Sequence, residues 1–99
     1  MTKIRKYIER IDDELEDAKR YAEKYVECKA KGNADGAGKY HAMAEDELKH
    51  AAWLHEMAAA EIVEIEKVFR PTEEMQHRWD ESHAHYVEHA AWIRRMLEM

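Results

Sequence analysis

The chain offers only two places at which a helix would have to end. The first is the segment 31–39, KGNADGAGK, which holds all three glycines and two residues that favour helix starts, Asn33 and Asp35. The second is the single proline, Pro71, which cannot continue a helix, whereas the following Thr72 can cap a new one. The sequence therefore predicts three helices, over roughly residues 2–30, 37–69 and 72–98.

Each predicted helix carries one stripe of mainly apolar residues, recurring at alternating steps of three and four. The stripes are formed by Ile4, Ile8, Ile11, Leu15, Ala18, Ala22 and Tyr25 in the first helix, by Tyr40, Met43, Glu47, His50, Leu54, Met57, Glu61, Ile65 and Val68 in the second, and by Met75, Trp79, Ser82, Tyr86, His89, Ile93 and Met96 in the third. At about 1.5 Å per residue, the first two helices would each be over about 40 Å long. We therefore expect an all-α fold and a single domain over residues 1–99, in which a long antiparallel hairpin is joined by a third helix.

Composition narrows the class of protein. Acidic and basic residues are interspersed and give a net charge of −6, which argues against a nucleic-acid partner. No apolar run approaches the roughly 20 residues that cross a bilayer, and the first ten residues turn polar before a signal sequence could form, so we expect a cytoplasmic protein without a membrane partner. The single cysteine, Cys28, excludes an internal disulfide. A core of this size is marginal and benefits from a metal or a partner chain.

The segment 44–57, AEDELKHAAWLHEM, contains Glu47 and His50 three residues apart, which places both on one face of the second predicted helix. This face carries the stripe that we expect to be buried. An unpaired buried carboxylate costs several kcal/mol, and a bound metal or a hydrogen-bonded Glu–His pair would remove that cost. The same spacing occurs at Glu74 and His77, but there it falls in the first turn of the third helix, off the stripe, where we expect solvent.

Glu14, at the edge of the first stripe, is a candidate third ligand. In an antiparallel hairpin that turns near residue 34, residues at equal height have numbers that average close to the turn. Residues 14 and 50 average 32, and residues 14 and 47 average 30.5, so the three side chains should meet. Carboxylate oxygen and imidazole nitrogen together suit iron, manganese and zinc.

This set, a Glu on the first helix followed after a long gap by Glu-x-x-His on the second, resembles the ferritin-like superfamily, of the bacterioferritin and rubrerythrin kind. The resemblance covers roughly residues 7–60. It implies a di-iron carboxylate site with Glu14, Glu47 and His50 as metal ligands, and oxidation of Fe(II) by O₂ or peroxide, a ferroxidase-type oxidoreductase activity. Manganese and zinc are the other metals that such ligands could take.

The chain departs from a full ferritin-like protein in having three predicted helices and no good second ligand set. A homodimer, or a higher homo-oligomer, would complete the four-helix bundle by supplying two copies of each ligand. The half-ferritin dimers associated with encapsulins are similar in outline. We expect no encapsulin partner, however, because the segment WIRRMLEM reads as helix rather than as a targeting tail.

Four further residues are weaker candidates for the site. Tyr21 could hydrogen-bond a ligand carboxylate or lie at the rim, and Glu61 could mark an ion path or pair with a Lys or Arg. His83 and His89 of the third helix could complete a site within one chain, without a dimer. The remaining histidines that we expect to be exposed are His41, His55, His77 and His85.

A function of a different class fits the same residues. The chain could be a non-enzymatic helical interaction or assembly module, in which a buried Glu and His specify the register of a dimer. Removal of metal separates the two hypotheses, because only a metal-held site loses stability to a chelator.

Overall fold

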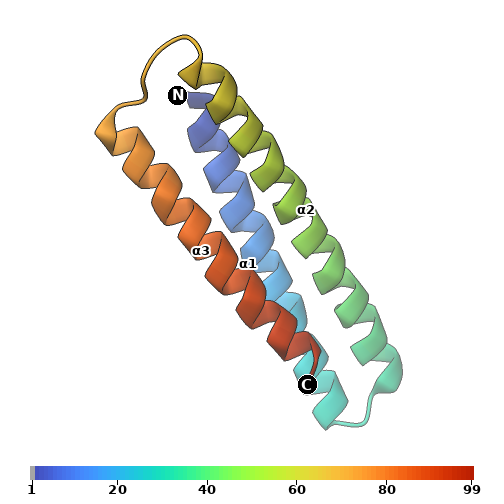
Figure 1. Ribbon diagram of the computed structural model, residues 1–99. Helices are drawn as coiled ribbons and strands as arrows, with labels where there is room; N and C mark the ends of the chain where they lie inside the picture. The colour runs from blue at the N-terminus through green and yellow to red at the C-terminus, as the bar shows by residue number, and fades with distance from the viewer. Residues whose placement is uncertain (1) are drawn as a thin grey trace.

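The computed structural model describes residues 2–99 as three helices and no strand (Figure 1). They are α1 (Thr2–Ala30), α2 (Ala34–Glu66) and α3 (Glu73–Leu97), and the molecule measures 55 × 17 × 17 Å. The prediction of an all-α fold is confirmed. Helix α2 runs antiparallel to α1, and α3 runs parallel to α1, so that all three share one long axis (Figure 1). None of the three helices is both long enough and apolar enough to cross a membrane.

The turn between α1 and α2 is much shorter than the predicted segment 31–39. Gly32 has a φ of +76°, a left-handed conformation that glycine adopts without strain, and the Asn33 N–H then donates to the Cys28 carbonyl over 2.9 Å. The Asn33 side chain accepts a hydrogen bond from the Gly36 N–H and caps α2 at once. Helix α2 therefore begins at Ala34 rather than at 37, and two glycines lie inside its first turns.

The second interruption also differs from its prediction by a few residues. Helix α2 ends at Glu66 rather than at 69, because the residue before Pro71 is disfavoured in a helix and the chain leaves α2 in a turn. The hydroxyl of Thr72 accepts a hydrogen bond from the Met75 N–H, and α3 then begins at Glu73, as expected for a Thr cap.

The α1 stripe is buried as predicted except at Ile8, which is half-buried, but the stripe predicted for α2 is only partly buried. Met43, Met57 and Val68 are 40%, 47% and 81% exposed. The buried stripe of α2 lies beside the predicted one and consists of Ala37, Ala44, Leu48, Ala51, Leu54 and Ala58. Alanine-rich stripes let two helix backbones approach closely, so α2 turns this side toward α1. The side with the larger residues is left at the rim of the interface.

Helix α3 covers one face of the α1–α2 hairpin. It buries Ser82, Ala90, Ile93 and Leu97 and packs mainly on α1. It contacts α2 at His55, whose ring stacks on Trp79 and Tyr86 and whose Nε2 lies 2.9 Å from His83 Nδ1. It also contacts α2 near its own end, where Nε2 of the half-buried His41 lies 3.1 Å from the Leu97 carbonyl oxygen, so His41 is not exposed as expected. The expectation that His55 is exposed is thus wrong: it is half-buried, and burial, followed by the nearby His83, lowers its pKa.

Candidate metal centre

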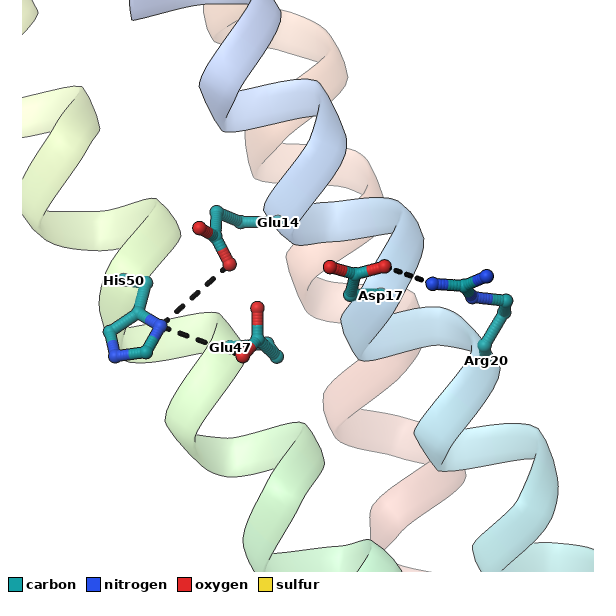
Figure 2. Close-up of polar contacts among 5 residues, drawn as sticks. All are labelled: Glu14, Asp17, Arg20, Glu47 and His50. Carbon is teal, nitrogen blue, oxygen red and sulfur yellow. Dashed lines mark hydrogen bonds and ion pairs between the residues drawn. The ribbon is translucent and has the colours of Figure 1, made fainter.

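Glu14 of α1 and Glu47 and His50 of α2 converge across the hairpin (Figure 2). His50 Nδ1 lies 3.7 Å from Glu14 Oε2 and 3.6 Å from Glu47 Oε1. Within residues 2–99 these three form the one group of at least three His, Cys, Asp or Glu side chains whose ligand atoms lie within 4.8 Å of one another. The structure therefore brings together the three residues that are predicted to lie at the same height in the antiparallel hairpin.

The position of the cluster follows from the packing of the hairpin. Glu14 precedes Leu15 and Glu47 precedes Leu48, and both leucines are buried in the α1–α2 interface, so the two acids stand at its edge. The side chains of Glu14 and Glu47 are 22% and 19% exposed, whereas that of His50 is 47% exposed. The sequence-based expectation of a core position is therefore wrong, and the cluster lies at the rim of the hairpin.

Glu14 perturbs the carboxyl group of Glu47. The pKa of Glu47 is raised from 4.5 to about 7, first by hydrogen bonding with Glu14, then by burial and by the negative charge of Glu14. His50 lowers this pKa, and Asp17, one turn after Glu14, raises it further. The Asp17 carboxylate itself pairs with Arg20 (Figure 2). Below a pH of about 7 Glu47 therefore keeps its proton beside Glu14, and a divalent cation could replace that proton.

The four weaker candidates lie elsewhere. Tyr21 stacks on Tyr40 with ring centroids 6.3 Å apart, two turns beyond Glu14, and Glu61 forms an ion pair with Lys3 over 3.3 Å, one of the two roles expected for it. His83 contacts His55, and the His89 ring lies 3.9 Å from that of His85.

Helix α3 lies on the opposite face of the hairpin from the cluster. His55, which contacts α3, follows His50 by five residues and so points about 140° away from it around α2. Figure 2 shows the same arrangement, with α3 behind α1 and the cluster directed away from it. His83 and His89 are therefore not brought to the three ligand-type side chains.

The sequence reasoning missed Asp17 and the exposed aromatic residue beside the cluster. Asp17 follows Glu14 by three residues, a spacing that could have identified it as a neighbouring charge. Trp53 follows His50 by three residues, and the ring centroids of the two side chains lie 6.0 Å apart, although Trp53 is 56% exposed.

Comparisons with models of protein families, with curated proteins and with solved structures give no match to this chain. The cluster and the face that carries it are therefore the features from which a function can be inferred.

Proposed function

We propose that this chain is a ferritin-like metal-binding protein in which Glu14, Glu47 and His50 hold a divalent metal, and in which two copies of the chain form a di-iron carboxylate site. The observation that carries the proposal is the convergence of two carboxylates and one imidazole from two facing helices, with the His50 Nδ1 atom 3.6 and 3.7 Å from the two acids.

The three side chains fit iron in charge, donor type and spacing. Ligand atoms that share one metal at bond lengths of about 2.0–2.2 Å lie about 3 Å apart, so small side-chain rotations suffice. Two carboxylates with one imidazole suit iron(II) and manganese(II), and also zinc. Iron, when bound, supplies the electrons that reduce O₂ or peroxide. The part of the chain is to fix the ligands and to release the proton held between Glu14 and Glu47.

The proposed dimer is supported by the pattern of the open face. On α1, Tyr7, Glu14 and Tyr21 follow one another at seven-residue intervals, and all three are half-buried. On α2, Met43, His50 and Met57 have the same spacing and are exposed. Seven residues make about two turns, so each set forms a straight strip that suits packing against another helix.

A second copy related by a two-fold axis would lay its own hairpin on this face and complete a four-helix bundle. The two chains would then supply four carboxylates and two histidines around one centre, which is the complement of a ferritin-like di-iron site. The contact would also cover the exposed methionines, whose burial in water-excluded packing is favourable.

Native mass spectrometry during anaerobic titration with Fe(II) tests the proposal. We expect two irons per dimer in the wild-type chain and none in Glu47→Gln. Glu16→Gln is the matched control, because Glu16 is exposed and lies two residues from Glu14, about 200° around α1. A wild-type chain that takes up no iron, or a Glu47→Gln chain that binds as well as the control, would refute the metal site. Oxygen consumption by the iron-loaded dimer then tests the ferroxidase-type activity.

The second candidate function, a helical interaction module without metal, is favoured by the same exposed methionine strip. It predicts a dimer whose melting temperature is unchanged by EDTA and by added Fe(II). The metal-binding proposal predicts a melting temperature that rises with Fe(II) and falls with the chelator, since only the folded protein has the assembled ligands.

A further inference from the structure

A second group of metal-ligand side chains lies on the other flank of α1, where α3 packs. His85 and His89 are four residues apart on α3, and their ring centroids are separated by 3.9 Å. Asp12 of α1 faces them, with its Oδ1 atom 3.9 Å from His85 Nε2. None of these three residues takes part in the function proposed above.

Asp12 and His85 border a hollow between the two helices. The hollow has a volume of about 330 Å³, and its wall is formed by Ile8, Asp12, Arg78, Glu81, Ser82 and His85. Ser82 is only 6% exposed, and its buried hydroxyl has no hydrogen-bond partner among the side chains and backbone of residues 2–99. A buried hydroxyl without a partner costs free energy, so this atom marks a place where a polar ligand or its bound water would be stabilised.

We infer that Asp12, His85 and His89 form a second, imidazole-rich site for a divalent transition metal of the zinc class. Two histidines four residues apart on a helix project from one face and can chelate one metal ion. Asp12 supplies the third ligand from the neighbouring helix, and the hollow beside Ser82 leaves room for a metal-bound water in the fourth position.

One distance, between Asp12 and His85, comes close to that of a zinc site, whereas the ligand atoms of Asp12, His85 and His89 do not yet all lie within 4.8 Å of one another, so that metal binding requires the His89 ring to turn. With bonds of about 2.0–2.1 Å in a tetrahedron, two ligand atoms on one zinc ion lie about 3.3 Å apart. The Asp12 and His85 atoms therefore need to approach by about half an ångström from their 3.9 Å separation. Both side chains are about half exposed, so solvent leaves them free to make this movement.

The donor set differs from that of the first site. Two imidazoles and one carboxylate are a donor set of zinc and also of non-haem iron(II), whereas the two carboxylates and one imidazole of the first site are a harder set. The bound metal would also join α1 to α3 through side chains 73 residues apart in the chain. Zinc should therefore stabilise the docking of α3 against the hairpin.

Zinc titration of the full chain carrying Glu47→Gln tests the inference, because that substitution disables the first site. We expect native mass spectrometry to show one zinc per chain in this background. Adding His85→Asn or His89→Asn should weaken zinc binding at least about tenfold, and adding Asp12→Asn should also weaken it. The control is His77→Asn, which removes an exposed histidine of the same helix and should bind zinc unchanged.

The outcomes separate this inference from the proposed function. If the Glu47→Gln chain binds no zinc while the wild-type chain does, zinc occupies only the first site, and the second site is refuted while the first stands. Equal weakening by His77→Asn and His85→Asn would also refute it, since it would show adventitious binding to histidine. Circular dichroism verifies that each variant keeps its helix content. His85→Asn in the wild-type chain, where Glu47 is intact, should still bind two irons per dimer.

Discussion

The Glu14–Glu47 pair should make the stability of the metal-free protein depend on pH, whether or not the protein binds iron. Glu47→Gln should leave the stability of the metal-free protein nearly unchanged at pH 5 and increase it at pH 8. At pH 5 the Glu47 carboxyl of the wild-type chain already carries a proton, so it resembles the neutral amide. At pH 8 it is ionised beside Glu14, whereas glutamine can donate its amide hydrogen to the Glu14 carboxylate.

The sign and size follow from the raised pKa of Glu47. Between pH 4.5 and about 7 the folded protein keeps a proton that the unfolded chain has released. The stability due to this proton is therefore complete below pH 4.5 and is lost as the pH rises through about 7. A pKa displaced from 4.5 to about 7 corresponds to about 3 kcal/mol in a fully shielded site. Because the cluster lies at a solvent-exposed rim, we expect about 1–2 kcal/mol.

Urea unfolding followed by circular dichroism, at equal protein concentration in EDTA, measures the effect at both pH values. The wild-type chain should lose about 1–2 kcal/mol more than Glu47→Gln between pH 5 and pH 8. Asp12, whose pKa is raised mainly by burial, contributes equally to both proteins and cancels in the comparison. Glu16→Gln should follow the wild-type curve. Parallel pH profiles for the wild-type chain and Glu47→Gln would show that the two acids share no proton and would refute the cluster geometry.

Three further predictions concern the packing, the open face and the turn between α1 and α2. Leu48→Ala should reduce the free energy of unfolding by about 2–5 kcal/mol in urea denaturation, because it opens a cavity between α1 and α2. Met43→Ala in the exposed strip should reduce it by less than about 1 kcal/mol in the isolated chain. Met57→Glu should shift the chain from dimer to monomer in analytical ultracentrifugation without loss of helix content, and an unchanged dimer would place the contact on another surface. Gly32→Ala should lower stability by about 1 kcal/mol, because alanine is strained at a φ of +76°, and an unchanged melting temperature would contradict the left-handed turn.

The sequence predicts the helices well because their signals are local. Asn33 and Thr72 are caps whose side chains accept hydrogen bonds from the backbone N–H three residues further on, and Gly32 provides the left-handed residue that closes α1. The lengths of the turns are less predictable, since a glycine inside 31–39 can either end the first helix or lie within the first turn of the second. Gly36 shows the second case, because the cap at Asn33 precedes it.

The sequence could not predict which side of α2 faces α1. Helix α2 carries two adjacent stripes, one of alanines with Leu48 and Leu54, and one of larger residues with Glu47 and His50. Hydrophobicity favours the stripe with methionines, but close backbone approach favours the alanines. The partner helix decides between them. The three candidate ligands nevertheless converge, because their positions along the hairpin axis depend on the register of the two helices. A rotation of α2 about its own axis moves its side chains between the core and the rim but does not change those positions.

The placement of α3 constrains what can complete the proposed metal centre. Asp12 and Glu14 are two residues apart and therefore point about 200° apart around α1, so the flank that meets α3 is not the flank that carries the cluster. Because α3 already covers one face of the hairpin, the cluster face is left to solvent within a single chain. Within residues 2–99 the ligand-type group has three members, so further ligands for a metal held by Glu14, Glu47 and His50 would come from water, from another molecule or from a movement of the nearby Asp17. The strip of Met43, His50 and Met57 beside the cluster favours a second hairpin of the same kind.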